Sequence, residues 1–331
     1  MPFLLALLLF LLGLVLPSPS LASAADPHLE VRGITVSTPT WGYEWGTDSM
    51  DRTLDALVET GANWVAIHPY ARIHDDGQVS WRPIDPDDPP EWLARPIAAA
   101  HARGLKVMIK PHLAYWGSGF SWRGEIDFDD PAARTRFFTS YSNWIEAVAR
   151  ATKDADAFVV GTELDRLVGE EQAWRALIVR VRRVNRGHLT YAANWDGYQR
   201  VPFWDALDAI GVQAYFPLLP AGRTPTEERL RAAWQPICAE LRRFSALTGK
   251  PVVFTELGYD ASPHAAVEPW KSGTGAEQVQ RDALRVALEV VQAEPSVRGA
   301  FLWKWFPGEL QRGDFRMSRP DVRAVVRERW K

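Results

Sequence analysis

The sequence predicts a single (β/α)8 barrel, the TIM-barrel fold, over residues 27–331. Its 331 residues with 47% hydrophobic content suit one α/β barrel of about 250 residues or more better than two small domains. Short apolar runs alternate with helical patterns after Asp26, and eight such runs can be counted. Strands that alternate with helices form a parallel sheet, and eight strands can close it into a barrel.

The eight runs have the composition of buried parallel strands, because they are β-branched and almost continuously apolar. They are expected at residues 33–37, 64–70, 106–113, 158–164, 189–194, 210–215, 252–258 and 300–305.

Capping signals mark the helices between the runs. Asp130 before Pro131 begins one helix, and Thr226 before two glutamates begins another. Three helices are expected to end at a glycine directly before a strand, namely at Gly61, Gly104 and Gly249. Residues 317–331 are expected to form a last helix packed under the barrel.

The longest connections, residues 71–91 and 114–129, follow strands and not helices. Both therefore belong on the face where the carboxyl ends of the strands meet, which carries function in this fold. Together with the loop after the first run, and with the residue that directly follows position 91, they hold six tryptophans, and we expect a cleft walled by these loops. The six are Trp41, Trp45, Trp81, Trp92, Trp116 and Trp122.

Two runs end in the same Thr-Glu pair. FVVGTEL at 158–164 and VVFTELG at 252–258 place Glu163 and Glu256 at the ends of the fourth and seventh predicted strands. A pair of carboxylates at that face is the minimum equipment for glycoside hydrolysis. The alternative is that either glutamate is a buried ion-pair partner of Lys110, Arg72 or Lys304.

Four motifs give the chain a family resemblance. They are Asn63-Trp-Val-Ala-Ile-His-Pro-Tyr, Gly161-Thr-Glu-Leu, Gln213-Ala-Tyr-Phe-Pro-Leu and Phe254-Thr-Glu-Leu-Gly-Tyr. Over most of residues 30–307 the chain resembles the retaining (β/α)8 glycosidases, and among them glycoside hydrolase family 113, whose described members are β-1,4-mannanases.

The resemblance implies a role for each glutamate. Glu163 would be the acid/base and Glu256 the nucleophile, with carboxyl groups about 5–5.5 Å apart. An ionised nucleophile nearby would raise the pKa of the acid.

The resemblance also implies that Tyr215 hydrogen-bonds the nucleophile, although a tyrosine that only fills the barrel top is the alternative. The related enzymes usually carry Asn before the acid/base, where this chain has Thr162. The contact that this asparagine makes with the sugar 2-hydroxyl therefore cannot be assigned to the chain. A threonine hydroxyl can still bind substrate, and Asn194 at the end of the fifth run is a further candidate.

Tryptophans near strand ends are candidates for stacking on pyranose rings, whose C–H faces are apolar. We select Trp41, Trp116, Trp303 and Trp305, and the resemblance implies that Trp303 stacks on the reacting sugar. Strand alternation predicts that Trp303 and Trp305 share one face. A packing role remains the alternative for each loop tryptophan, including Trp195.

His68 and His112 end the second and third runs, and either line the sugar site as hydrogen-bond donors or are satisfied core histidines. No metal or cofactor is expected. The first run has no histidine, the single Cys238 cannot supply a zinc site, and no glycine-rich phosphate motif follows a strand.

Charge and the N-terminus constrain partners and location. A net charge of −3 from 38 basic and 41 acidic residues predicts no nucleic acid or anionic membrane partner, and we expect a monomer that binds a polysaccharide or oligosaccharide.

Residues 1–24 are expected to be a signal peptide, with an apolar run at 3–16 and small residues before position 25. The protein would be secreted or periplasmic. No Lys or Arg precedes the run, so an uncleaved anchor stays open.

Three functions fit these observations. The chain is either a secreted retaining glycoside hydrolase of β-linked polysaccharide, with β-1,4-mannan the first choice, a non-catalytic carbohydrate-binding barrel, or a cell-wall-processing or scaffold protein.

Overall fold

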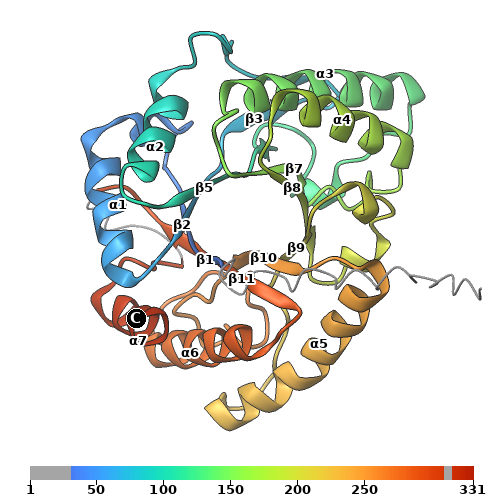
Figure 1. The fold of residues 1–331 in the computed structure, drawn as a ribbon. Helices are drawn as coiled ribbons and strands as arrows, with labels where there is room; N and C mark the ends of the chain where they lie inside the picture. Colours follow the sequence, from blue (N-terminus) through green and yellow to red (C-terminus); the bar gives the residue numbers. More distant parts are fainter. Residues whose placement is uncertain (1–30, 309–314) are drawn as a thin grey trace, which may run out of the picture. The chain divides into compact units, whose positions relative to one another are not determined.

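Eight parallel strands close into a barrel in the computed structural model, which describes residues 31–308 and 315–331 (Figure 1). The order around the barrel is β1-β11-β10-β9-β8-β7-β5-β2, which is the order of the eight predicted runs, so the predicted fold is confirmed. The strands are β1 (Val31–Val36), β2 (Trp64–Ile67), β5 (Lys106–Ile109), β7 (Ala157–Thr162), β8 (His188–Asn194), β9 (Ile210–Gln213), β10 (Val252–Leu257) and β11 (Val297–Trp305). The predicted signal peptide, residues 1–24, lies outside the described residues.

Helices surround the outside of the barrel (Figure 1). They are α1 (Asp48–Thr60), α2 (Glu91–His101), α3 (Pro131–Ala151), α4 (Glu171–Val184), α5 (Glu227–Thr248), α6 (Glu277–Ala293) and α7 (Pro320–Trp330). Both predicted N-terminal caps are present: the Asp130 carboxylate accepts hydrogen bonds from two backbone N–H groups of α3, and the Thr226 hydroxyl accepts one from Arg229. Gly61 and Gly249 take left-handed conformations directly after α1 and α5, as predicted. The predicted helix end at Gly104 is wrong, because α2 already ends at His101 and Gly104 lies in the turn that follows.

The second and third predicted strands are shorter than expected, because Pro69 and Pro111 interrupt them. Proline has no N–H to donate to the barrel ladder. Beyond these prolines the chain forms a separate three-stranded sheet of β4 (Val79–Ser80), β3 (Tyr70–Ile73) and β6 (His112–Ala114). The interruption leaves His68 and Lys110 at the carboxyl-end rim of the barrel.

The core has two layers. One cluster contains only strand residues, among them Trp64, Ala66, Met108 and Phe301, and it fills the barrel interior. Their sequence neighbours, such as Val65 and Ile67, belong to the larger cluster between barrel and helices, as alternation along a strand requires. The barrel interior is therefore apolar below the carboxyl-end rim, and its polar side chains gather at that rim.

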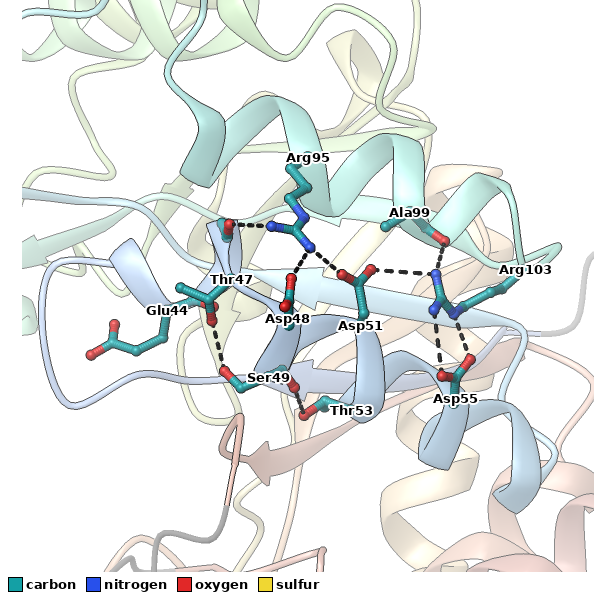
Figure 2. A network of polar contacts seen from close by, with 11 residues as sticks. Glu44, Thr47, Asp48, Ser49, Asp51, Thr53, Asp55, Arg95, Ala99 and Arg103 are labelled. Carbon is teal, nitrogen blue, oxygen red and sulfur yellow. Dashed lines mark hydrogen bonds and ion pairs between the residues drawn. The ribbon is translucent and has the colours of Figure 1, made fainter.

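A network of ion pairs joins α1 to α2 and to the short helix η1 (Tyr43–Gly46) (Figure 2). Arg95 of α2 donates to the Gly46 carbonyl oxygen at 2.9 Å and pairs with Asp48 and Asp51 of α1. Arg103 pairs in the same way with Asp55 at 2.6 Å. Half-exposed pairs of this kind add little stability. They do fix the loop after β1 against α2, and that loop carries Trp41 and Tyr43.

Candidate active site

Charged side chains meet at the carboxyl-end rim of the barrel. Glu163 follows β7 and Glu256 lies in β10, while Lys110 follows β5. Gln213 ends β9, and Tyr215 stands two residues beyond it. The structure thus brings both predicted glutamates and the predicted tyrosine to one end of the barrel.

Both carboxylate oxygens of Glu256 are held by donors. The Tyr215 hydroxyl donates to Oε2 at 2.5 Å, and Lys110 Nζ donates to Oε1. Glu256 is 3% exposed and Lys110 is fully buried, and Lys110 also donates to the Thr255 carbonyl oxygen at 3.2 Å. Burial lowers the pKa of Lys110, against the raising effect of the Glu256 charge. Two charge-assisted hydrogen bonds fix this carboxylate in position.

Gln213 lies between the two glutamates. Its side-chain oxygen accepts hydrogen bonds from the Thr255 hydroxyl at 3.1 Å and from Lys110 Nζ at 3.4 Å. Its buried Nε2 makes no hydrogen bond within 3.5 Å to a described residue, yet it lies close enough to Glu163 to lower the pKa of that carboxyl. The amide therefore has a donor available for a ligand at the rim.

Glu163 turns away from the strand at a left-handed residue, with φ of 56°. This conformation is strained for a residue with a side chain, and the Glu163 N–H, which donates to the Ala192 carbonyl oxygen at 2.9 Å, helps to hold it. The carboxylate then meets Arg123 of the short helix η2 (Arg123–Glu125), whose Nε and Nη2 donate to Oε2 at 3.0 and 2.6 Å.

This ion pair reverses the electrostatics expected for an acid. Burial pushes the pKa of Glu163 up, but the charge and hydrogen bonds of Arg123 outweigh burial and hold the pKa below its ordinary value. The predicted rise in the pKa is therefore wrong for the free protein. The predicted alternative of buried ion pairs holds in part, since Lys110 pairs with Glu256. Glu163 pairs with an arginine that the sequence did not single out.

An aromatic wall borders Glu256. The rings of His68 and His112 stack with centroids 4.8 Å apart, and Trp303 lies 5.4 and 5.9 Å from them. His112 Nε2 is 3.8 Å from Glu256 Oε1. Burial first, and then the charges of Lys110 and Arg123, lower the pKa of both histidines, so both rings are neutral near pH 7.

The histidines combine features of both predicted alternatives. They are buried as core histidines are, but neither ring nitrogen of His68, and not Nε2 of His112, has a hydrogen-bond partner among the described residues. Buried polar groups without partners are rare and costly. A sugar hydroxyl at the rim is the kind of group that would satisfy them.

The comparison that decides the family covers most of the barrel. The model of Glycoside Hydrolase Family 113 matches residues 36–315.

The chain belongs to glycoside hydrolase family 113. A solved structure described as a complex of a GH113 β-1,4-mannanase has a TM-score of 0.78 at 24% identity, and the match covers 91% of this chain and 98% of that chain. The GH113 β-mannanase AaManA from Alicyclobacillus acidocaldarius, solved in complex with ManMIm, is 28% identical with a TM-score of 0.75, over 91% and 97%. A β-glucuronidase from Ruminococcus gnavus shares the fold alone, with 15% identity and a TM-score of 0.61, over 91% and 50%. No curated protein matches the sequence.

In this family 113 glycoside hydrolase, Trp305 does not share a face of β11 with Trp303, contrary to the prediction. Ile34 of β1 pairs with Leu302 of β11, and Val36 pairs with Trp305. Between these two pairs β11 therefore has one residue more than β1. This irregularity breaks the alternation, so Trp305 turns into the core, where it is 5% exposed and Arg323 of α7 lies 5.6 Å from its ring. The predicted contact of Trp305 with sugar is therefore wrong.

Other predicted binding residues of the family 113 enzyme have protein partners already. Thr162 is buried and donates its hydroxyl hydrogen to the Pro111 carbonyl oxygen at 3.1 Å, so it has no hydrogen left to donate to a sugar. Asn194 is buried and donates to Asp165 at 2.9 Å. Burial raises the pKa of that aspartate to about 6, despite the hydrogen bond from Asn194.

The loop tryptophans divide into exposed and buried ones. Trp116 is 54% exposed and Trp122 is 38% exposed, while Trp41 is half-buried against the edge of Tyr70. Trp45 is fully buried and donates its ring N–H to the Val36 carbonyl oxygen, so it is a core residue. Sequence reasoning missed Trp270, which is 46% exposed and stacks on Trp195.

Three polar residues of the enzyme's site were not predicted as functional residues from the sequence: Lys110, Gln213 and Arg123. A lysine in Ile109-Lys110-Pro111-His112, at the end of an apolar strand, was a readable signal, and Gln213 stood in a quoted motif. Arg123 had no signal, because it lies in a long loop whose path sequence does not give.

The described residues contain no group of three or more His, Cys, Asp or Glu side chains placed to hold a metal ion. Within residues 31–308 and 315–331, no helix is long and apolar enough to cross a membrane.

Proposed function

We propose that this enzyme hydrolyses a β-1,4-linked mannan-type polysaccharide with retention of anomeric configuration, using Glu256 as nucleophile and Glu163 as acid/base. The observation that carries the proposal is the buried carboxylate of Glu256, fixed between Tyr215 and Lys110 at the rim where Glu163 also stands.

In the first step a Glu256 oxygen bonds to the anomeric carbon while the bond from that carbon to the glycosidic oxygen breaks. Glu163 gives its proton to the departing oxygen, so the leaving chain ends in a hydroxyl. In the second step Glu163 takes a proton from water, the water oxygen bonds to the anomeric carbon, and the Glu256 carboxylate departs. Tyr215 and Lys110 stabilise that carboxylate in its free form.

Internal cleavage is supported by exposed or half-buried tryptophans on opposite arcs of the barrel. Trp41 and Trp116 follow β1 and β6, whereas Trp195 and Trp270 follow β8 and β10. A chain that crosses the rim between the two groups can stack on both. For the polymer itself, the support is the similarity to solved GH113 β-1,4-mannanases.

We also propose that the enzyme is exported and acts as a monomer, on the pattern of residues 1–24 and the balanced charge. Amino-terminal sequencing of protein recovered outside the cytoplasm tests cleavage of the leader. Size-exclusion chromatography with light scattering tests the monomer.

The mechanism is tested with single substitutions and a substrate series. Glu256→Gln should abolish turnover of every substrate, because the nucleophile is lost. Glu163→Gln should lower turnover of manno-oligosaccharides by about 10²–10⁴-fold, yet spare the first step on an aryl glycoside whose leaving group needs no proton. Glu59→Gln, an exposed glutamate of α1, is the matched control and should leave rates unchanged.

NMR of the first-formed product decides the stereochemistry. Retention gives the β-anomer before mutarotation, whereas an α-anomer would overturn the double-displacement mechanism. A barrel that binds oligosaccharide but shows no turnover in the unsubstituted enzyme would instead support the carbohydrate-binding alternative.

A further inference from the structure

A cavity lies beside the candidate active site. Its volume is about 260 Å³, and its wall includes Trp41, Tyr43, Tyr70, Arg72, Trp81 and Arg82. These residues come from the loop after β1, from β3 and from the segment after β4. The volume lies just below the range of roughly 300–1,000 Å³ that is usual for pockets of drug-sized ligands, so it suits one sugar unit and not a length of chain.

Tyr70 connects this pocket to the reacting centre. It is part of the pocket wall, and its ring lies 5.1 Å from the His68 ring and 5.9 Å from the His112 ring. Those histidines border Glu256. A sugar in the pocket would therefore be close in the chain to the sugar that reacts.

The pocket walls are held in place by the protein itself. Trp41 packs edge-on against Tyr70, and Tyr43 packs edge-on against Trp92 of α2. The network around Arg95 ties η1, which contains Tyr43, to α1 and α2 (Figure 2). A site whose walls are already ordered loses little entropy on binding.

The polar groups of the pocket are unusual for a site that takes a neutral sugar. None of its lining residues is acidic, although sugar hydroxyls need acceptors as well as donors. Two arginines line it, and the side chains of Arg72 and Arg82 make no hydrogen bond or ion pair within the described residues.

The two guanidinium groups lie over aromatic rings. Arg72 is 5.8 Å from the centroid of the Trp41 ring, and Arg82 is 4.8 Å from that of Tyr43. An arginine held over a ring by cation–π attraction keeps N–H donors with which it can bind a planar carboxylate. Other arginines of the chain, such as Arg95 and Arg103, are already paired with carboxylates of the protein.

We propose that this pocket is a subsite for an acidic sugar unit, a uronate or a hexose with a carboxylate substituent, in a β-linked polysaccharide. An aromatic ring of the wall would carry the apolar face of the pyranose, and Arg72 and Arg82 would bind its carboxylate. The inference rests on the proposed function, because it extends the same site to the substrate class of acidic heteropolysaccharides.

The test compares two oligosaccharides of equal length and linkage, one containing a uronate and one in which that carboxyl has been reduced to the alcohol. The unsubstituted enzyme should show a kcat/KM at least tenfold higher for the acidic substrate, and this ratio should fall as sodium chloride is raised, because exposed charges are screened. In the double variant Arg72→Met/Arg82→Met the ratio should approach one. Arg150→Met, an exposed arginine of α3, is the control and should keep the ratio.

An acidic-to-neutral ratio near one in the unsubstituted enzyme, or a ratio that survives in the double variant, overturns the proposal. If the enzyme cleaves neither substrate, the proposed function fails and the pocket is judged by calorimetry. Tighter binding of the acidic oligosaccharide that is lost in the double variant supports the subsite, and equal binding of both oligosaccharides overturns it.

Discussion

Replacing Arg123 should move the basic limb of the pH–activity profile to higher pH. In the free enzyme, kcat/KM requires Glu163 with its proton and Glu256 without one. Activity is therefore present below the pKa of Glu163 and is lost as the pH rises through it. Because Arg123 lowers that pKa, Arg123→Met should raise it and extend activity upward in pH.

The magnitude follows from the contact that is removed. Arg123 donates two hydrogen bonds to one oxygen of Glu163, at 3.0 and 2.6 Å, and both side chains are well buried. A hydrogen bond to a charged group stabilises by about 1.5–3 kcal/mol, and 1.36 kcal/mol corresponds to a tenfold change in proton affinity. The basic limb should move to higher pH by about one pH unit or more.

The assay is kcat/KM across pH on a manno-oligosaccharide, whose leaving group needs the acid. Arg123→Lys, which keeps a positive charge, is the matched control and should retain most of the low-pH position of the limb. The reading is the position of the limb and not the height of the profile, because Arg123 can also affect binding. A basic limb that stays in place or moves to lower pH in Arg123→Met, with the fold intact by circular dichroism, would refute the reasoning.

Four further outcomes are expected. Tyr215→Phe should lower kcat by a factor of about 10–10² with little change in KM, because it removes a hydrogen bond that stabilises the departing Glu256 carboxylate. Steady-state kinetics measures both constants. Asp165 has a pKa raised to about 6, so its ionisation destabilises the fold as the pH rises from about 4 to 6. Asp165→Asn should therefore raise the melting temperature at pH 7–8 and not at pH 4, measured by scanning calorimetry. Trp303→Ala should lower turnover, whereas Trp122→Ala should chiefly raise KM for long chains, since Trp303 packs against the histidines at Glu256 and Trp122 is exposed. Dialysis against a chelator should leave the rate unchanged, and a rate restored by one divalent ion would contradict this.

The fold was predictable because its signals are local. Each barrel strand is an apolar run, and caps such as Asp130 and Gly61 mark helix ends within a few residues. The positions of Glu163 and Glu256 followed, because a strand end in a parallel barrel fixes the face on which the next side chain lies.

What sequence reasoning missed depends on contacts between distant segments. The fate of Trp305 depends on a one-residue mismatch between β11 and β1, which neither strand reveals alone. The electrostatics of Glu163 depend on Arg123, which stands 40 residues earlier in a loop. Long loops carry no periodicity, so their side chains can be placed only in three dimensions.

The balance of charge at the rim explains why the missed arginine matters most. Two cations, Lys110 and Arg123, each pair with one anion, Glu256 or Glu163, so the formal charges of these four side chains sum to zero when both glutamates are ionised. The neutral histidines beside them add nothing to this sum. A proton on Glu163, which the first chemical step requires, leaves the buried site with an excess positive charge. Arg123 therefore opposes the protonation that the first chemical step requires, and the pH profile of Arg123→Met measures how strongly it does so.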